Sequence, residues 1–424
     1  MTETLARAST AGDGSTGAAD AGVGAGAASG PALMADAARR WLLHSGVRTT
    51  QRQSLAGGLR RGYLPRAGGW LGCYPEITAY AVQFHLRWQD AVGARRDEDL
   101  AAATESGAWL LARQAQGGAA AGAFPYECGE SGVPGVDGAA SAAATGGYYT
   151  FDTAIAGHAL LDLWRATGRL EFRTAAERAA RWVLARQHAE GSFAACLGEP
   201  HVSWAGDRAC LHGKHALLLL AWERASGDPH WGAAARKLLD WLLTLQDEHG
   251  GVRVRAGQPW IFLHAHCYAA EGLLAGALRW GEPYQGAALR AAQFLAACQG
   301  RDGSVPRYHG AARAYLAESG ARWPLLRAWC VPRDVGATAQ AGRIWVWADQ
   351  LTRARRFAPQ VDRALGWLVR HQLRSADVRI DGALPAARDP LRPWDPLEWR
   401  FYPWVAVFAA DLARLSAAPS LNLF

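Results

Sequence analysis

The sequence lacks the features of a secreted, disulfide-stabilised protein. Its 424 residues contain seven cysteines, an odd number, and no two of them form a Cys-x-x-Cys pair. The first thirty residues also lack the basic start and apolar core of a signal peptide. We therefore expect a cytoplasmic protein. Residues 1–30, rich in Ala, Gly and Ser, are predicted to form a disordered leader ahead of one folded domain at 31–424.

Long apolar runs and basic clusters are also missing. No apolar run reaches the length needed to cross a bilayer, so we expect no membrane span. The net charge is +7, but the arginines are spread along the chain. No basic cluster alternates with aromatic residues on a single element, which argues against nucleic acid as a partner.

An aromatic residue recurs five positions before a glutamine. The five copies are Trp109 and Gln114, Trp182 and Gln187, Trp241 and Gln246, Phe294 and Gln299, and Trp367 and Gln372. Trp41 with Gly46 resembles a degenerate first copy, and in three copies a glycine follows the glutamine by four residues. Each copy ends a segment with charges on one side and apolar residues on the other, at helical period. The repeat predicts six amphipathic helices.

A second kind of helix lies between these repeats and is apolar nearly all round, as in FDTAIAGHALLDLWRATG and IFLHAHCYAAEGLLAGALRWG. A helix without a polar face is normally surrounded by other helices. No strand-like alternation of useful length is present. We therefore predict an all-α (α/α)6 toroid of six helical hairpins, with an inner ring of six apolar helices and an outer ring of six amphipathic ones. An open α-solenoid is the alternative, although its helices expose long polar faces.

Polar and aromatic residues gather where the predicted inner helices begin. Pairs such as Glu76 with Tyr80 and His264 with Tyr268 are four residues apart and therefore share a helix face. Inner helices that all point the same way bring these faces to one end of the ring. Carboxylates, imidazoles, phenols and indoles in one cavity are typical of a sugar site. The candidate catalytic residues are Tyr74, Glu76, Tyr80, Asp152, His264 and Asp334. The candidate substrate-binding residues are Trp70, His212, Lys214, His266, Tyr268, Gln340, Arg343, Trp399, Arg400 and Tyr402.

Several candidates also have a purely structural interpretation. Asp152 and Asp334 each open a helix and are possible N-caps, and Glu76 is favoured by the helix dipole alone. A zinc site is a further alternative, with ligands drawn from Cys210, His212, His264, His266 and Cys267. Buried cysteines and core histidines are commoner than ligands, so we expect neither a metal nor a cofactor.

Four segments carry a resemblance to known proteins: GGWLGCYPEITAY at 68–80, FDTAIAGHALL at 151–161, DVGATAQ at 334–340 and FYPWVAVFAADL at 401–412. With them the chain resembles the six-hairpin (α/α)6 toroid proteins. Within that group it looks most like bacterial proteins of polysaccharide and surface-glycan loci that are related to the C-terminal domain of glucuronyl C5-epimerases. The resemblance implies a toroid, a saccharide ligand and association with glycan-assembly enzymes.

The aromatic and glutamine repeat is also similar to that of squalene-type terpenoid cyclases and protein prenyltransferases, which share the toroid. The sequence has neither an Asp-x-Asp-Asp acid nor an Asp-rich magnesium motif. Cys210-Leu211-His212-Gly213 has one residue too many for the zinc motif of lanthionine-type cyclases. A cyclase-like or prenyltransferase-like protein that has lost its Asp-rich motifs remains an alternative.

Two hypotheses of different classes follow. The first is a carbohydrate-active enzyme that abstracts a proton next to a uronate carboxylate, as an epimerase or lyase does, with glycoside hydrolysis second. Tyr74, Tyr80 or His264 then supply acid and base, Glu76 orients them, and Lys214 or Arg343 neutralises the substrate carboxylate. The second is a non-catalytic glycan-binding or scaffold toroid. An open acidic and aromatic cleft favours the enzyme, and a centre filled by tryptophan favours the binder.

Overall fold

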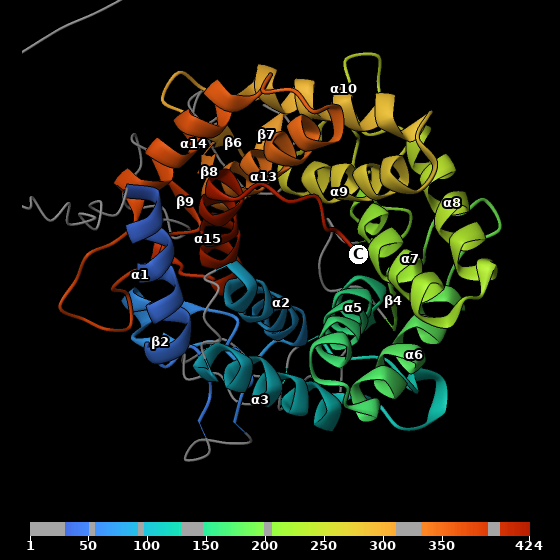
Figure 1. Cartoon of the computed structure of the whole chain (residues 1–424), viewed down its shortest axis with the longest axis horizontal. Helices are drawn as coiled ribbons and strands as arrows, with labels where there is room; N and C mark the ends of the chain where they lie inside the picture. Colours follow the sequence, from blue (N-terminus) through green and yellow to red (C-terminus); the bar gives the residue numbers. More distant parts are fainter. Residues whose placement is uncertain are drawn as a thin grey trace, which may run out of the picture.

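The computed structural model describes residues 30–50, 56–91, 97–126, 128, 147–198, 206–310, 332–388 and 399–424. Twelve α-helices lie within these ranges, and they form two concentric rings (Figure 1). The predicted leader at 1–30 lies outside the described residues except for Gly30, the first residue of α1. Within the described ranges, no helix has the length and hydropathy of a membrane-spanning segment.

The inner ring consists of the helices that the sequence predicts to be apolar all round. They are α2 (Pro75–Ala91), α5 (Thr150–Thr167), α7 (His215–Ser226), α9 (Leu263–Trp280), α13 (Val335–Thr352) and α15 (Pro403–Ala417). A short 3-10 helix, η4 (Cys210–Lys214), leads directly into α7. Every residue of α9 from Leu263 to Ala277 is buried, because helices surround it on all sides.

The outer ring consists of the amphipathic helices α1 (Gly30–His44), α3 (Asp97–Arg113), α6 (Leu170–Leu184), α8 (Pro229–Leu243), α10 (Tyr284–Cys298) and α14 (Ala358–His371). The first outer helix, α1, packs against α14 and α15, the last two helices of the chain. The ring is therefore closed, which excludes the open solenoid and confirms the (α/α)6 toroid.

The repeated glutamines join neighbouring outer helices. Gln187 Nε2 donates to the carbonyl oxygen of Gly191 at 3.0 Å and to that of Ala234, in α8, at 2.9 Å. The last copy closes the ring, since Gln372 Nε2 donates to Met34 O in α1 at 2.9 Å. The same two-acceptor arrangement occurs at Gln114, Gln246 and Gln299. Each glutamine thus satisfies backbone carbonyls that end one hairpin and begin the next.

The glycine after the glutamine allows this close approach. Gly191 has φ 108°, and a Cβ there would lie 2.1 Å from the carbonyl oxygen of Lys237 in α8. Gly250 repeats the geometry one hairpin later, with φ 91° and a distance of 2.3 Å to Arg290 O. Only glycine combines this backbone conformation with this contact.

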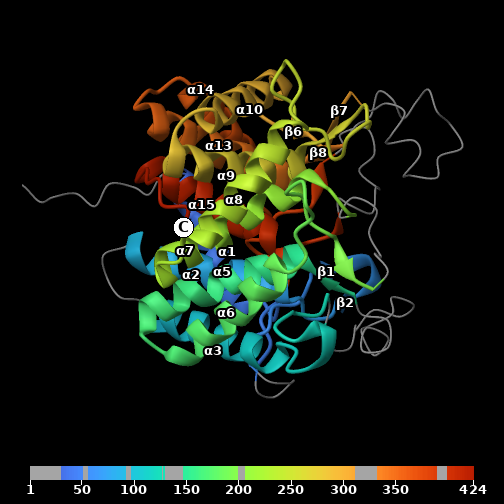
Figure 2. The same cartoon turned by 90° about the vertical axis from the view of Figure 1, so that its right-hand side faces the viewer.

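Short strands lie at one end of the ring, which we call the entry end. They are β1 (Tyr63–Leu64), β2 (Gly69–Trp70), β3 (Tyr148–Tyr149), β4 (Cys196–Leu197), β5 (Ile261–Phe262), β6 (Val305–Pro306), β7 (Tyr308–His309), β8 (Arg333–Asp334) and β9 (Ala387–Arg388). All pairings are antiparallel: β1 with β2, β3 with β4, β5 with β7, and β6 with β8 with β9. Three of these strands run directly into inner helices, and the C-terminus lies at the opposite end (Figure 2).

Candidate active site

A cavity of about 340 Å³ opens among the first turns of the inner helices. We call it the entry cavity. Eight of the sixteen residues predicted for the site line it: Tyr74, Glu76, Asp152, His264, Tyr268, Asp334, Arg400 and Tyr402. Further lining residues include Arg61, Tyr126, Tyr149, Phe151, Phe262, Arg307 and Trp404. A single tryptophan lines the cavity among the described residues, so tryptophan does not fill the centre of the ring at this end.

Two buried carboxyl groups and a tyrosine come together at the start of α2 and α5. The Tyr74 hydroxyl donates to Asp152, with both carboxylate oxygens at 3.0 Å. The N-cap of α5 is Tyr149, with no side-chain cap hydrogen bond, so Asp152 is not a cap. Asp334, in contrast, caps α13 by accepting a hydrogen bond from Ala337 N at 2.8 Å. The alternative of an N-cap therefore holds for Asp334 and fails for Asp152.

Glu76 and Asp152 keep a proton between them near neutral pH. Burial raises the pKa of Glu76 to about 7, although the charge of Lys214 and the hydroxyls of Tyr74 and Tyr80 act in the opposite direction. Burial also holds the pKa of Asp152 well above its ordinary value, and the nearby Glu76 raises that pKa further. The pair can therefore both donate and accept a proton at neutral pH.

Tyr74 and His264 are poorly suited to act as bases in this environment. Burial raises the pKa of Tyr74 well above its ordinary value, and the carboxyl groups of Asp152 and Glu76 raise it further. Tyr74 is therefore a hydrogen-bond donor. Burial lowers the pKa of His264 to about 3, and the charges of Arg307 and Lys214 act in the same direction. His264 is thus a neutral imidazole at physiological pH.

Aromatic rings form the walls of the entry cavity. Tyr402 and Trp404 stack with their centroids 4.2 Å apart and an interplanar angle of 13°. Tyr126 packs against Tyr74 at 4.9 Å and against Tyr149 at 5.4 Å. Flat aromatic faces beside polar groups are what a sugar ring requires, because its C–H faces are apolar and its edges carry hydroxyl groups.

Three arginines border the entry cavity. Arg61 Nη1 donates to the Tyr126 hydroxyl at 3.2 Å, and Arg400 Nη1 lies 3.4 Å from the Tyr402 hydroxyl. Arg307 lies near Asp334 and lowers the pKa of that carboxyl, although burial raises it overall. Because Glu76 and Asp152 retain a proton between them, the lining groups favour a ligand of negative charge.

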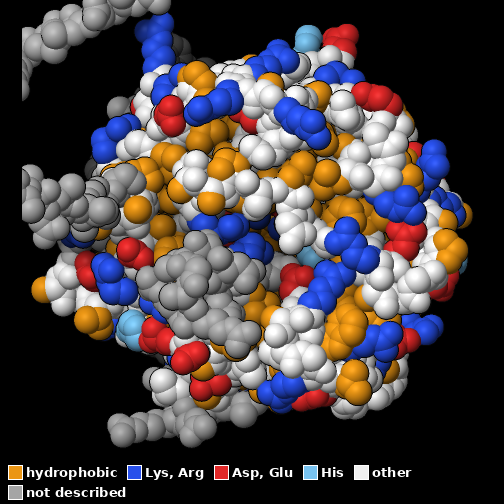
Figure 3. Space-filling model, in the orientation of Figure 1, with side chains coloured by type: hydrophobic (Ala, Val, Ile, Leu, Met, Phe, Trp, Pro, Cys, Tyr) orange, Lys and Arg blue, Asp and Glu red, His pale blue; other side chains and the backbone are white. Residues whose placement is uncertain are grey.

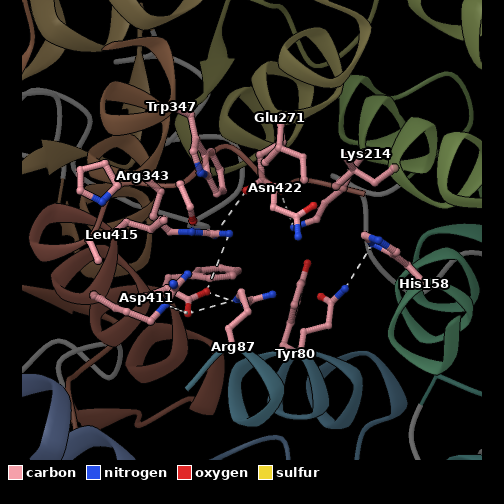
Figure 4. A pocket seen from close by; sticks show the side chains of 18 residues that line it. Tyr80, Arg87, His158, Lys214, Glu271, Arg343, Trp347, Asp411, Leu415 and Asn422 are labelled. Carbon is pink, nitrogen blue, oxygen red and sulfur yellow. Dashed lines mark hydrogen bonds and ion pairs between the residues drawn. The ribbon is translucent and has the colours of Figure 1, made fainter. Parts of the chain in front are cut away.

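The other predicted residues lie elsewhere. Tyr80, Lys214 and Arg343 line a second cavity deeper in the ring (Figure 4). Five residues line neither cavity: Trp70, His212, His266, Gln340 and Trp399. These five residues lie outside both cavities, so we do not include them in the site. Glu398, which precedes α15 in the sequence, lies outside the described residues.

The structure gives three of those five residues other environments. His266 accepts a hydrogen bond from Val252 N at 3.0 Å and donates to Ala291 O at 3.2 Å, so both its nitrogens serve the backbone. His212 is fully buried and stacks on His215 with centroids 4.9 Å apart. Trp399 is 39% exposed, with the guanidinium of Arg66 over its ring. These three residues therefore do not share a face toward the site.

In the described part of the chain, no group of three or more His, Cys, Asp or Glu side chains is arranged to hold a metal ion. The zinc alternative therefore lacks a ligand set. The backbone hydrogen bonds of His266 occupy both ring nitrogens of one proposed ligand. Burial raises the pKa of Cys210 to about 12 and that of Cys267 well above its ordinary value. Both thiols are therefore protonated, as core cysteines are.

No protein-family model and no curated protein matches the sequence. Solved structures match over nearly the whole chain. An unsaturated glucuronyl hydrolase specific for heparin has a TM-score of 0.66 at 10% identity, over 92% of this chain and 97% of that one. The (α/α)6 toroid is thus the fold of this chain. Cellobiose 2-epimerase from Spirochaeta thermophila has a TM-score of 0.64 at 15% identity, over 92% and 96%. A protein from Actinoplanes has a TM-score of 0.54 at 19% identity, over 91% and 100%. At such identities the likeness concerns the fold, so we argue function from the site.

Proposed function

We propose that this toroid is a carbohydrate-active enzyme that moves protons on a uronate-containing saccharide. The observation that supports it most is the buried group of Glu76, Tyr74 and Asp152 in the entry cavity. Two carboxyl groups with raised pKa values form an acid and a base that work at neutral pH. A purely structural carboxylate gains nothing from such an environment, since burial destabilises its ionised form more than the nearby charge of Lys214 stabilises it.

The two carboxyl groups take different roles. Glu76, with a pKa of about 7, is the base and takes the proton from the carbon next to the uronate carboxylate. The negative charge left on the substrate spreads into its carboxylate, where the arginines of the cavity stabilise it. Asp152 is the acid and returns a proton to that carbon from the other face, which inverts it, or protonates a departing sugar oxygen, which gives an unsaturated product. Tyr74 orients Asp152 through its hydrogen bond.

The substrate carboxylate binds at the arginines of the entry cavity. Arg307 is the centre of this subsite, and Arg61 and Arg400 line the same cavity. A guanidinium group fits a carboxylate with two parallel hydrogen bonds, which a lysine does not provide. The sugar ring packs on the aromatic wall of Tyr402 and Trp404. An unsaturated glucuronyl hydrolase among the structural neighbours is consistent with an acidic saccharide as ligand.

Glycoside hydrolysis is the second candidate reaction, and the neighbouring carboxyl groups favour it. In that reaction Asp152 protonates the leaving oxygen, and Glu76 activates a water molecule or attacks the sugar directly. Both reactions use the same two residues, but they differ in the step that Glu76 carries out and in the product. A non-catalytic scaffold is less well supported, because the entry cavity is open and acidic groups lie inside it. Association with glycan-assembly enzymes stays a prediction.

The test is to incubate the full chain with a panel of uronate-containing polysaccharides and oligosaccharides in deuterated water. Deuterium at C5 of recovered uronate indicates epimerisation, and new ultraviolet absorbance indicates elimination. New reducing ends without either signal indicate hydrolysis. We expect one of these signals with an acidic substrate and none with the matching neutral saccharide. The absence of all three signals across the panel would overturn it.

A further inference from the structure

A second cavity lies at the opposite end of the ring from the short strands. Its volume is about 420 Å³. Residues of the inner helices and of η4 line it, together with residues 418–420, 422 and 423 that follow α15 (Figure 4). On the face of the molecule shown in Figure 3, basic side chains gather in the central hollow. Three residues of the predicted site, Tyr80, Lys214 and Arg343, line this cavity, but the proposed reaction does not use it.

Basic groups outnumber acidic ones among the described residues of this lining. The cations are Arg87, Lys214, Arg343 and Arg414, and the carboxylates are Glu271 and Asp411. Asp411 is paired with Arg87 at 2.6 Å, and Glu271 is paired with Lys214 at 2.8 Å. Each carboxylate thus already has a close basic partner. Arg343 shares both carboxylates with these closer cations, and a buried charge that is only partly compensated is costly.

Arg343 is a buried cation whose donors the protein satisfies only in part. It is 6% exposed, and its Nε makes no hydrogen bond. Its nearest carboxylate oxygens are those of Glu271 at 3.4 Å and Asp411 at 4.0 Å, and both carboxylates have closer partners. Buried donors in proteins are nearly always paired, and a buried guanidinium N–H without an acceptor is expensive. A ligand that accepts from Arg343 would remove this cost.

The walls around Arg343 fit a ligand with a ring or an alkyl portion. The guanidinium lies between the rings of Trp347, at 4.6 Å, and Phe408, at 4.8 Å. The side chain of Asn422 also reaches the cavity (Figure 4) and offers an amide for a hydroxyl group. The volume lies within the range of small-molecule sites. The lining therefore suits a small organic anion, with its charged group at Arg343.

The two cavities are separate. Tyr80 lines the second cavity and Tyr268 lines the entry cavity. The ammonium group of Lys214 lies over both rings, at 4.7 Å from Tyr80 and 4.6 Å from Tyr268, while it pairs with Glu271. This layer of aromatic rings and an ion pair lies between the carboxyl groups of Glu76 and Asp152 on one side and Arg343 on the other.

We propose that the second cavity is a binding site for a small sugar-sized anion, carrying a phosphate or carboxylate group that Arg343 and Arg87 hold. The site does not depend on the reaction in the entry cavity, so its test uses binding alone. The full chain is titrated by calorimetry with glucose 6-phosphate, glucuronate, inorganic phosphate and neutral glucose. We expect the anionic sugars to bind and glucose not to bind. Because the entry cavity is itself proposed to bind uronates, only binding that Arg343→Gln weakens is assigned to the second cavity.

Substitutions in the two cavities show which cavity the ligand occupies. Arg343→Gln should weaken it at least tenfold, and Arg87→Gln should weaken it as well. Glu76→Gln, in the entry cavity, should leave the affinity for glucose 6-phosphate unchanged. Arg181→Gln is the matched control, because Arg181 lies in α6, is 68% exposed and pairs with Glu177. Equal losses in Arg343→Gln and Arg181→Gln would reveal a general charge effect and overturn the proposal, and so would failure of every anionic sugar to bind.

A crystal structure of the wild-type chain soaked with glucose 6-phosphate keeps the test independent of how the variants fold. The expected result is ligand density with its phosphate within hydrogen-bonding distance of Arg343. Density confined to the entry cavity, beside Arg307, would contradict the inference while leaving the proposed enzyme intact. Density in the second cavity together with an inactive protein would leave this inference standing and remove the enzyme.

Discussion

The hydroxyl of Tyr74 lies 3.0 Å from both carboxylate oxygens of Asp152, although 78 residues separate the two in sequence. Tyr74 immediately precedes α2, and Asp152 is the third residue of α5. Because α2 and α5 are neighbours in the inner ring, their first turns bring these side chains together. Glu76, on the same turn as Tyr74, completes the group that we propose to carry the chemistry.

Tyr74→Phe tests the orienting role of this hydrogen bond. The hydroxyl lowers the pKa of both Asp152 and Glu76, so its loss should raise both pKa values. The pH dependence of kcat/KM should therefore move to higher pH, and kcat should fall by up to about 100-fold from misplacement of the acid. A Phe variant whose pH profile stays where the wild-type profile lies would show that Tyr74 has no influence on the pair.

Glu76→Gln tests whether the ionised carboxylate of Glu76 destabilises the folded protein. The pKa of Glu76 is raised to about 7 in the folded chain from an ordinary value near 4.5. The folded state therefore binds the proton more tightly than the unfolded state, and stability falls as the pH rises from about 4.5 to 7. Glutamine does not titrate. The variant should match or exceed the wild type in stability at pH 8, by a margin on the order of 1–3 kcal/mol.

The measurement for Glu76→Gln is thermal denaturation of both proteins from acidic to slightly alkaline pH. The wild type should lose stability relative to the variant as the pH increases through this window. A variant that is less stable than the wild type by the same amount at every pH would mean that Glu76 is a structural partner of the helix dipole, and its place in the acid–base pair would be lost.

The fold was predictable because its signal is local and repeated. The outer helices have one apolar stripe, the inner helices have no polar face, and the two kinds alternate along the chain. The role of the repeated glutamine was not predictable, because its second acceptor lies far along the sequence. Ala234, for example, is 47 residues from Gln187. Only the packing of one outer helix on the next shows why a glutamine ends each of these helices.

Gln372→Ala tests the bond that closes the ring. The substitution leaves Met34 O and Gly382 O without their donor, which should cost about 1–3 kcal/mol of unfolding free energy. Denaturant unfolding measures this loss, and the affinity of the entry cavity should be unchanged. Gln350→Ala is the matched control, since Gln350 is exposed at the end of α13 and should change stability by less than about 0.5 kcal/mol. Similar stability in both variants would argue against the closing role.

About half of the residues that the sequence predicts for the site line the entry cavity. Whether a predicted residue does so depends on how far along its helix it lies. Glu76 and Asp152 lie in the first turn of their helices and face the entry cavity. Tyr80 lies one turn deeper and lines the second cavity instead, whereas Gln340 lies in the core. Helical spacing identifies residues that share a face, but it does not show how far along the ring a cavity extends.

Arg307 and Glu271 were not predicted from the sequence, for different reasons. Arg307 lies between the short strands β6 and β7, where no helical period relates it to the entrances. Glu271 lies in an otherwise apolar inner helix. A lone carboxylate in such a helix needs a buried cation, and that was a usable signal, since Lys214 is its partner.

Arg307→Gln tests the proposed carboxylate subsite. Loss of a charged hydrogen-bonding partner should raise KM for a uronate-containing substrate by about tenfold to 100-fold. Binding of a neutral analogue of the same sugar should change little, and Arg181→Gln again serves as the exposed control. If the variant loses affinity for acidic and neutral sugars alike, Arg307 maintains the shape of the cavity and does not recognise the charge of the substrate.

The central claim is that Glu76 and Asp152 are the acid–base pair of an enzyme acting on an acidic saccharide. The most direct measurement is turnover of a uronate substrate by the wild type, Glu76→Gln and Asp152→Asn, with ligand affinity measured on the same preparations. The account predicts that each substitution lowers kcat by about 100-fold to 10,000-fold while the saccharide still binds. Turnover at the wild-type rate in either variant would contradict it.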